Sequence, residues 1–324
     1  MPKILVTGGA GYIGSVTTHH LLRRGFDVVV IDDLSRGHRK NVAAERLHVL
    51  RLQDTDGVAR LLAGVDAVVH FAAYIAVGES IRAPELYFSN NVGGTVSLLE
   101  AMARADVKRL VFSSTAAVYG DPAKVPIPED AGFAPVSPYG ESKAMVEKIL
   151  AQLDRYRGLR SVALRYFNAC GAEPDAGLGE EHDPETHLIP LLFRAAVTGA
   201  PIEIFGDDYA TSDGTCVRDY VHVGDLAAAH VVALDHLMAG GATGAFNVGT
   251  GMRLTVLEVL RAVEEVTGKR VPHKIAARRE GDPTELVADA SKLRRQLGWR
   301  PERSGIHEIV RDAWEYFERR NAPS

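Results

Sequence analysis

Three glycines in a short loop constrain the fold of this chain more than any other feature. Gly8, Gly11 and Gly14 are each separated by two residues, after an apolar run at 3–7 and before a helical pattern at 12–24. In a strand-to-helix turn, the first glycine permits a tight bend, the second lets the backbone approach a pyrophosphate, and the third lets the helix pack against the strand. Phosphates also bind at helix N-termini. The loop therefore predicts dinucleotide binding.

An acidic residue completes this motif. Asp32 lies 18 residues after Gly14, directly after a second predicted strand at 26–31. A carboxylate at that place accepts hydrogen bonds from the ribose of an adenosine. Asp33 beside it would repel a ribose 2′-phosphate, so we predict NAD rather than NADP as the cofactor. A tight turn without a ligand would explain the glycines, but it would not explain the acid.

Strand-like and helical segments alternate through the first half of the chain. Helical patterns cover 57–62, 92–105 and 139–156, and strand-like runs cover 47–50, 67–71, 110–112 and 161–164. Such alternation places parallel strands in one sheet with helices on both faces. We predict an α/β fold, with a Rossmann-type doubly wound parallel sheet over residues 1–168 as the NAD-binding domain.

The pattern changes after residue 168. The segment 169–185 is rich in glycine, proline and acidic residues and is expected to be a long loop. The remaining segments suggest helices at 189–198, 224–238, 255–267 and 305–320 and strands at 202–205 and 245–248. We predict a smaller C-terminal α/β substrate domain over 169–324, and residues near 220–250 are candidates to return to the first sheet.

Composition argues against several classes of protein. The 324 residues carry 37 Lys and Arg against 42 Asp and Glu, a net charge of −5, which disfavours nucleic acid or anionic membranes as partners. No run approaches the ~20 apolar residues of a membrane span. Cys170 and Cys216 are the only cysteines, which excludes a disulfide scaffold and favours the reducing cytoplasm. The histidines show no recognised metal-ligand spacing with Cys or acidic residues, so no metal site is predicted.

A tyrosine and a lysine four residues apart form the candidate catalytic pair. Tyr139 and Lys143 open the helical stretch after Pro138 and share one helix face. Lowering the pKa of a phenol from ~10 to about 7 requires roughly 4 kcal/mol, which a neighbouring ammonium and a cationic nicotinamide can supply. Thr115 follows the predicted strand at 110–112, at its carboxyl end, where it can hydrogen-bond a reacting hydroxyl. Such a pair also occurs by chance in helices, but behind a dinucleotide motif it favours a tyrosine base.

Several longer stretches resemble a known family. They are TGGAGYIGS (7–15), HFAAYIAVGES (70–80), NNVGGT (90–95), FSSTAAVYGDP (112–122), SPYGESK (137–143), LRYFNACGA (164–172), IFGDDYATSDGTCVRDYVHV (204–223) and RREGDPTELVADASK (278–292). Over nearly its whole length the chain resembles the extended short-chain dehydrogenase/reductases, and within them the epimerases of nucleotide sugars. The resemblance implies an NAD-dependent isomerase that interconverts UDP-glucose and UDP-galactose, with 169–324 as the UDP-sugar-binding domain.

The resemblance also implies a mechanism. NAD+ would take the hydride from sugar C4 while Tyr139 takes the proton of the 4-hydroxyl. The 4-ketose would turn within the site and receive the hydride on its opposite face. Lys143 would lower the pKa of Tyr139 and contact the nicotinamide ribose, and Thr115 would hold the 4-oxygen.

The motif and the resemblance together assign the other site residues. Cofactor contacts are expected from Gly8, Gly11, Tyr12, Ile13, Gly14, Asp32, Asp33, Leu34, Ser35, Arg36, Gly37, Asp54, Thr55, Phe71, Ala72, Ala73, Asn90, Tyr139, Lys143 and Phe167. Substrate contacts are expected from Thr115, Tyr139, Asn168, His187, Leu188, Phe205, Arg218, Arg279, Asp282 and Leu286. Arginine suits bidentate phosphate binding, which independently supports Arg218 and Arg279. Taken alone, each would more simply form a surface ion pair with Asp219 or Asp282.

Three positions depart from the family pattern. Ile75 stands where some epimerases carry a cofactor-contacting lysine, and His187 stands where others carry asparagine. Leu286 replaces a tyrosine of members restricted to non-acetylated sugars, and its intermediate size leaves acceptance of N-acetylated UDP-hexosamines open. Family members are commonly homodimers, and the stretches 92–105 and 145–156 are the candidate dimer helices.

Other functions compete with this interpretation. A dehydratase of the same family carries an acid directly after the Ser/Thr position, where this chain has Ala116 and Ala117, which cannot transfer a proton. A catalytically silent NAD-binding sensor can share the fold, but the intact Thr115, Tyr139 and Lys143 disfavour it. Another nucleotide-sugar epimerase of the family stays open as an alternative.

Overall fold

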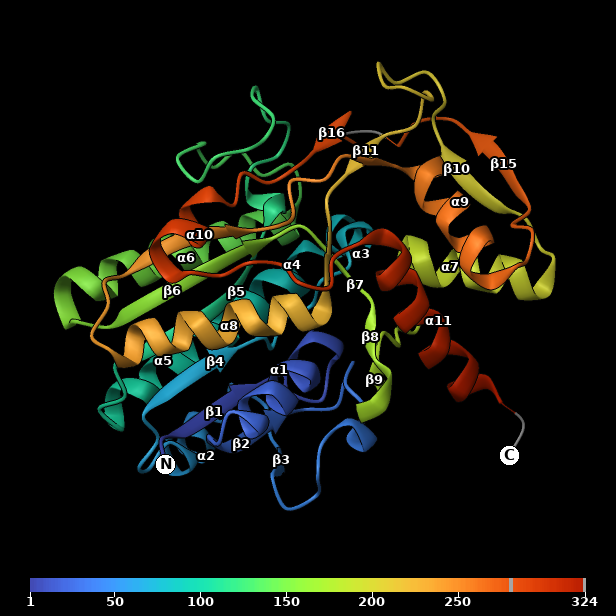
Figure 1. Cartoon of the computed structure of the whole chain (residues 1–324). Helices are drawn as coiled ribbons and strands as arrows, with labels where there is room; N and C mark the ends of the chain where they lie inside the picture. Colours follow the sequence, from blue (N-terminus) through green and yellow to red (C-terminus); the bar gives the residue numbers. More distant parts are fainter. Residues whose placement is uncertain (280–281, 323–324) are drawn as a thin grey trace.

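A seven-stranded parallel sheet organises the computed structural model, which describes residues 1–279 and 282–322 (Figure 1). Its strands lie in the order β13-β6-β5-β4-β1-β2-β3. They are β1 (Lys3–Thr7), β2 (Asp27–Asp32), β3 (Leu47–Val49), β4 (Ala67–His70), β5 (Arg109–Thr115), β6 (Arg160–Tyr166) and β13 (Gly244–Val248). Every neighbouring pair is parallel. The prediction of a Rossmann-type doubly wound α/β sheet is confirmed.

Helices cover both faces of this sheet, as the apolar character of its strands requires. The first face packs against α1 (Tyr12–Arg23), α8 (Val223–Met238) and α10 (Ser291–Leu297). The second packs against α2 (Thr55–Leu61), α5 (Gly94–Arg104) and α6 (Pro138–Arg157). Successive residues of β1 point to opposite faces, with Ile4 and Val6 in one core and Leu5 in the other.

The direction of strand addition reverses at β1. The chain first builds β2 and β3 on one side of β1, then crosses to β4 and continues outward through β5 and β6. At such a reversal the loops after neighbouring strands diverge and leave a crevice at their carboxyl ends. Thr7, Asp32, His70 and Thr115 are the last residues of the four strands nearest this point.

The link between β4 and α5 is more helical than the sequence predicted. It holds α3 (Val77–Arg82), α4 (Pro84–Tyr87) and η2 (Phe88–Gly93), a π-helical turn that runs into α5. The helix predicted over 92–105 therefore starts in a wider turn. Such turns are rare in helices and frequent at functional sites. Two short 3-10 turns lie elsewhere in this part, η1 (Arg39–Asn41) and η3 (Ala116–Val118).

The C-terminal part is built from short strands. They pair as β12 (Tyr220–His222) with β7 (Asn168–Cys170), β8 (Ala172–Glu173) with β9 (Leu178–Gly179), β10 (Ile202–Phe205) with β15 (His273–Ala276), and β11 (Val217–Arg218) between β14 (Leu254–Thr255) and β16 (Glu285–Leu286). Its helices are α7 (Leu188–Thr198), α9 (Val256–Thr267) and α11 (Ile306–Asn321), with a 3-10 turn, η4 (Pro174–Ala176). Residues 169–185, expected to be a loop, contain β8, β9 and most of β7, because strands this short leave no sequence period.

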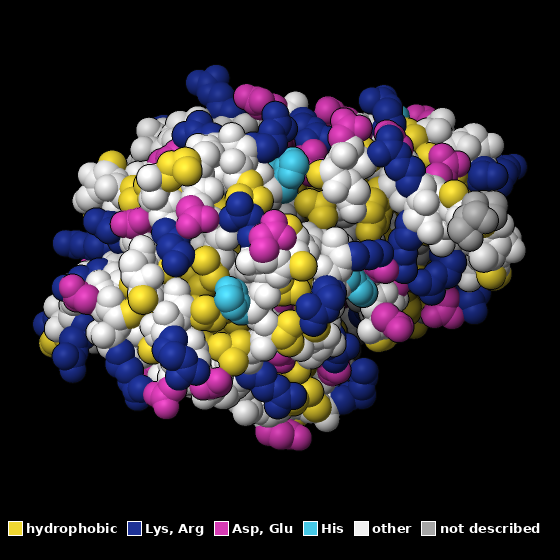
Figure 2. Space-filling view, turned by 90° about the horizontal axis from the view of Figure 1, so that it is seen from below, with side chains coloured by type: hydrophobic (Ala, Val, Ile, Leu, Met, Phe, Trp, Pro, Cys, Tyr) yellow, Lys and Arg dark blue, Asp and Glu magenta, His cyan; other side chains and the backbone are white. Residues whose placement is uncertain are grey.

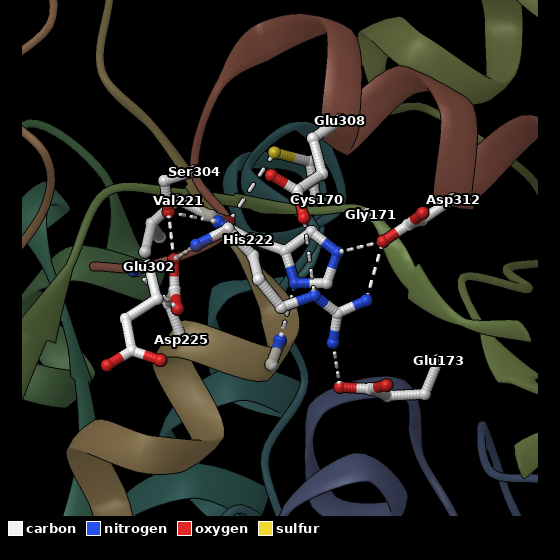
Figure 3. A network of polar contacts seen from close by, with 12 residues as sticks. Cys170, Gly171, Glu173, Val221, His222, Asp225, Glu302, Ser304, Glu308 and Asp312 are labelled. Carbon is white, nitrogen blue, oxygen red and sulfur yellow. Dashed lines mark hydrogen bonds and ion pairs between the residues drawn. The ribbon is translucent and has the colours of Figure 1, made fainter. Parts of the chain in front are cut away.

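A buried polar network fixes α11 to the start of α8 (Figure 3). His222, the last residue of β12, directs Nε2 to Asp312 of α11 at 3.1 Å. Arg303 bridges Asp312 at 2.5 Å and Glu173 at 2.6 Å. Asp225 accepts the backbone N–H of Arg303 at 2.9 Å. The network joins β8, α8 and α11, which are far apart in the sequence.

The surface carries charges of both signs. On the face shown in Figure 2, basic and acidic side chains are interspersed with apolar ones. Among the helices of the described residues, none is both long enough and apolar enough to cross a membrane.

Candidate active site

The glycine loop leaves no room for side chains at two of its positions. Gly8 adopts a φ of +70°, and a Cβ there would lie 2.6 Å from the backbone nitrogen of Ala72. A Cβ on Gly14 would lie 2.2 Å from the carbonyl oxygen of Gly8. Gly11 is the N-cap of α1 and donates its N–H to Gly8 at 3.2 Å. The loop thus lies against the start of the segment after β4 and exposes the first turn of α1 to a ligand.

Asp32 organises the neighbouring turn. Its two carboxylate oxygens accept the backbone N–H groups of Ala10 at 2.9 Å and Leu34 at 2.8 Å. Burial raises the pKa of Asp32, and these two hydrogen bonds oppose that shift. Each carboxylate oxygen can accept a further bond, so Asp32 can also receive a ribose hydroxyl. Asp33 accepts both the backbone N–H and the hydroxyl of Ser35, at 3.0 and 2.6 Å.

Other expected cofactor residues lie at the carboxyl end of β4 and at the start of α1. Phe71, directly after β4, packs its ring 4.6 Å from that of His230. Tyr12 donates its hydroxyl to Gly171 at 2.7 Å and thereby ties α1 to the segment after β7. Ile75, the departure from the lysine of some epimerases, is 43% exposed.

Three expected cofactor residues already take part in local structure. Asp54 caps α2 by accepting the N–H of Gly57 at 2.9 Å, and Thr55 is the first residue of that helix. Arg36 pairs with Glu79 at 2.7 Å.

The candidate catalytic pair is buried at the start of α6. Ser137 caps this helix by accepting the N–H of Gly140 at 3.2 Å. Lys143 donates to the carbonyl of Ser113 at 2.8 Å, which links α6 to the end of β5. Burial raises the pKa of Tyr139 to about 12, with Thr115 opposing the shift. Burial also lowers the pKa of Lys143 to about 7, with Glu147 opposing it.

Thr115 lies where β5 ends, as predicted. Its side-chain oxygen accepts the N–H of Ala117 at 3.1 Å and so shapes the turn that follows. Ala116 and Phe167 belong to the same buried apolar cluster, which Leu286 of β16 also contacts. Residues expected on the cofactor side and on the substrate side therefore meet beside Thr115.

Sequence reasoning missed a buried ion pair behind this site. Glu147 binds Arg165 of β6 at 2.7 Å, with both side chains almost wholly buried. The same carboxylate accepts the hydroxyl of Ser114 at 2.5 Å, one residue before Thr115. Arg165 also donates to Tyr119 at 2.9 Å. The available signal was a charge placed four residues after Lys143, on the buried face of a predicted helix.

A second missed residue is Asn91 in the π-helical turn. Its side-chain oxygen accepts the N–H of Tyr74 at 2.8 Å, and its amide donates to the hydroxyl of Ser142 at 3.1 Å. Asn90, which was expected to contact the cofactor, donates to Asn91 at 3.0 Å. Asn91 thereby connects the loop after β4 to α6, the helix of the candidate catalytic pair.

The two arginines expected to bind phosphate hold different partners. Arg218 contacts Asp282 and donates to the carbonyls of Val217 at 2.8 Å and Pro283 at 3.0 Å. A guanidinium has five N–H donors, and these contacts use three. Arg279 lies 3.9 Å above the ring centre of Phe205.

Three other expected substrate residues lie on β16, β7 and α7. Leu286 pairs with Arg218 in register between β16 and β11. Asn168 donates its side-chain amide to the carbonyl of Asp219 at 2.9 Å. Leu188, the first residue of α7, packs against the C-terminal core.

His187, the N-cap of α7, belongs to a cluster that was not expected. Glu180, His182, Glu185 and His187 place one nitrogen or oxygen atom each within 4.8 Å of one another. The sequence prediction concerned only recognised metal-ligand spacings, and this cluster was therefore not predicted. The spacing of these four residues matches no familiar ligand pattern, and only the fold of the segment after β9 makes them converge.

The chain is similar to known proteins over most of its length. Residues 4–249 match the NAD dependent epimerase/dehydratase family. The chain is 48% identical to the UDP-glucose 4-epimerase of Lactobacillus helveticus over 320 residues, which cover 98% of this chain and 97% of that protein.

The chain is also similar to solved structures. The UDP-glucose 4-epimerase of Brucella ovis in complex with NAD superposes with a TM-score of 0.95 at 43% identity, covering 98% of each chain. The UDP-glucose 4-epimerase of Bifidobacterium longum in complex with NAD+ and UDP superposes with a TM-score of 0.91 at 37% identity, again covering 98% of each chain. The chain belongs to the NAD dependent epimerase/dehydratase family.

Proposed function

We infer that this chain is an NAD-dependent UDP-glucose 4-epimerase, which interconverts UDP-glucose and UDP-galactose. One observation carries the inference. Tyr139 and Lys143 are buried at the start of α6 beside Thr115, at the crevice edge of a sheet whose glycine loop excludes side chains. Relatives that bear this activity in their names match the chain over nearly its whole length.

The residues present fit a dinucleotide. Gly8 and Gly14, where a Cβ would clash with backbone atoms, keep the loop tight, and Gly11 between them would let the pyrophosphate approach the first turn of α1. Asp32 would hold the adenosine ribose, and with Asp33 beside it the site favours NAD over NADP. When bound, NAD+ would accept the hydride of sugar C4, and its reduced form would return it.

Tyr139 moves the proton in this reaction. It accepts the proton of the 4-hydroxyl when the sugar is oxidised and returns it on reduction, while Thr115 holds the 4-oxygen. Because burial raises its pKa to about 12, the phenolate needs a positive charge nearby. Lys143, one helical turn away, is placed to provide that charge.

The substrate side would bind UDP through contacts from several elements. Arg218 and Arg279 would neutralise the pyrophosphate, and Phe205, Asn168 and Asp282 border the same region. His187 and Leu188 would contact UDP from the start of α7. Leu286, next to Phe167 and Ala116, would border the sugar.

Dehydration is the competing reaction, and the residues after Thr115 disfavour it. Ala116 and Ala117 form the turn after β5 and offer no proton to a leaving hydroxyl.

We propose that the active form is a homodimer in the cytoplasm. Large apolar side chains that stay exposed on neighbouring helices support the homodimer, namely Ile81, Leu86, Val96 and Met145. Two buried free cysteines support the reducing cytoplasm. We expect light scattering to give twice the chain mass. A Val96→Lys, Met145→Lys variant should be a monomer, because two charges at an apolar seam oppose association. A wild-type protein with the mass of one chain would contradict this proposal.

A single assay tests the activity. We expect the purified protein to release NAD on denaturation and, before it, to interconvert UDP-glucose and UDP-galactose without added cofactor. Parallel incubations with UDP-N-acetylglucosamine and dTDP-glucose test the substrate range and the competing dehydration. A 4-keto-6-deoxy product would overturn the assignment, as would the absence of both NAD and epimerisation.

A further inference from the structure

The cluster before α7 is unusual because two imidazoles and two carboxylates share one small volume. Glu180, His182, Glu185 and His187 come from eight consecutive residues between β9 and α7. The side chains of Glu180 and Glu185 are only 7% and 5% exposed. Two carboxylates held this close inside a protein repel each other unless positive charge lies between them.

Hydrogen bonding within the protein accounts for only part of this geometry. Glu185 accepts the backbone N–H groups of Thr186 and His187 at 2.8 and 2.9 Å, and His187 Nδ1 hydrogen-bonds Glu180. His182 Nδ1 lies 3.2 Å from an oxygen of Glu180 and 3.7 Å from an oxygen of Glu185. It is buried, yet it forms no hydrogen bond with the described residues. The nitrogen therefore lies between the two carboxylates instead of pointing at either one. His187 Nδ1 approaches the same oxygen of Glu180.

The two separations from His182 Nδ1 are those of ligands around one metal ion. Zinc binds imidazole nitrogen and carboxylate oxygen at about 2.0–2.2 Å, so tetrahedral ligand atoms lie roughly 3.3–3.5 Å apart. The two distances from His182 bracket that value, and all four ligand atoms lie within 4.8 Å of one another. Imidazole with carboxylate suits the first-row divalent metals.

We propose that Glu180, His182, Glu185 and His187 bind one divalent transition-metal ion, with Zn²⁺ as the best match to the donor set. The ion neutralises both buried carboxylates and closes the segment 180–187 into a rigid loop. Because His187 binds through Nδ1, its Nε2 stays available to a ligand at the start of α7. Tyr12 of the cofactor loop packs edge-on against His182, at 6.3 Å between ring centres. The ion therefore stiffens the segment 180–187, which lies between the cofactor loop and the start of α7 on the substrate side.

Metal content tests the proposal directly. Tag-free protein is stripped with a chelator, incubated with Zn²⁺, freed of unbound metal and analysed by mass spectrometry. We expect about one equivalent of zinc in the wild type and below about a tenth in His182→Asn and Glu185→Gln, since each variant loses one of four ligands. His307→Asn is the matched control, because His307 forms an exposed pair with Glu265 at 2.8 Å outside the cluster. It should bind zinc like the wild type.

Two further readouts separate a metal site from a structural ion-pair cluster. Replacement by Co²⁺ should give the intense visible absorption of tetrahedral cobalt in the wild type and in His307→Asn only. Added Zn²⁺ should raise the unfolding temperature of those two proteins and leave that of His182→Asn unchanged. Bound NAD, measured in every variant, shows that each one is folded.

Either of two results would overturn the proposal. It fails if stripped wild-type protein retains no zinc, or if His182→Asn and Glu185→Gln retain as much as the control. The proposal does not rest on the assigned activity. A wild-type protein that epimerises but retains no zinc would refute only the metal site. A wild-type protein that retains zinc but does not epimerise would refute only the activity.

Discussion

The two parts of the molecule hold their site residues by different means. On the cofactor side, Asp32 and Thr115 end strands of six and seven residues that pair continuously with parallel neighbours. On the substrate side, Arg218 and Leu286 lie on strands of two residues each, which pair across a gap of 68 residues (286 − 218). The cofactor side is fixed by its backbone, whereas the substrate side depends on individual side-chain contacts such as that between Arg218 and Asp282.

This difference has a functional consequence. A loop that has no room for a Cβ at Gly8 and Gly14 tolerates no side chain there, so the cofactor side is fixed at these two positions. Contacts between side chains on short strands can be exchanged one at a time. We therefore expect substitutions on the cofactor side to abolish function and those on the substrate side to adjust it.

The strongest test separates chemistry from binding on the cofactor side. Replacing Tyr139 by phenylalanine removes one hydroxyl and keeps the buried ring. We expect kcat to fall by about 10³- to 10⁴-fold, in the upper range of general acid–base catalysis. NAD content and the KM for UDP-glucose should change little, because neither requires the proton transfer. Single-turnover and steady-state assays on the same preparation check this, and near-normal turnover would refute the role of Tyr139.

The next test changes a residue of the glycine loop itself. In Gly14→Ala the new Cβ would lie 2.2 Å from the Gly8 carbonyl oxygen, so the loop must move. We expect the free energy of unfolding to fall by about 2–3 kcal/mol and most bound NAD to be lost. Urea unfolding and nucleotide release measure the two effects. Gly132→Ala is the control, since its Cβ meets no atom within 4 Å. A Gly14→Ala protein with full NAD content would contradict a rigid loop.

The same contrast between the cofactor side and the substrate side explains how much of each could be predicted from the sequence. The glycine loop, Asp32 and the pair Tyr139 and Lys143 depend on neighbours within a few residues or on one strand and one helix, so local patterns are enough. Most predicted helices agree with the structure to within a few residues, because a helical period repeats over several turns. The π-helical start of α5 is the exception, since nothing in NNVGGT signals a wider turn.

The remainder needs the folded chain. Strands β11, β14 and β16 have two residues each and no period, so their pairing could not be foreseen. Asn91 was one residue away from an expected contact, but its role arises from Tyr74 and Ser142, which only the fold brings near. The substrate residues around Arg218 came from resemblance rather than from physical reasoning.

A substitution on the substrate side should have a smaller and more selective effect. Arg218→Lys keeps the charge but loses the planar fork that binds a phosphate through two hydrogen bonds. We expect the KM for UDP-glucose to rise roughly tenfold to a hundredfold, with NAD content unchanged. Arg253→Lys, which alters an exposed ion pair with Glu285 on β16, should change the KM less than about threefold. Equal effects in both variants would show that Arg218 only supports β11.

The smallest expected effect is a dependence of the free energy of unfolding on pH, caused by the burial of Lys143 on the cofactor side. Burial lowers the pKa of Lys143 to about 7 in the folded chain, whereas in the unfolded chain a lysine titrates near ~10.4. Between these values the unfolded chain binds a proton that the folded chain does not. The free energy of unfolding must therefore rise with pH, by at most about 1.4 kcal/mol per pH unit, and it should be flat below pH 7.

Urea unfolding of the nucleotide-free protein at several pH values between about 6 and 9 measures this slope. The wild type should gain about 1–2 kcal/mol over Lys143→Met between pH 7 and 8.5, since the methionine has no proton to lose. Parallel profiles would mean that Lys143 stays charged in the fold, stabilised by Glu147 and the Ser113 carbonyl more than its burial destabilises it. In that case the ammonium that Tyr139 needs would already be present before the cofactor binds.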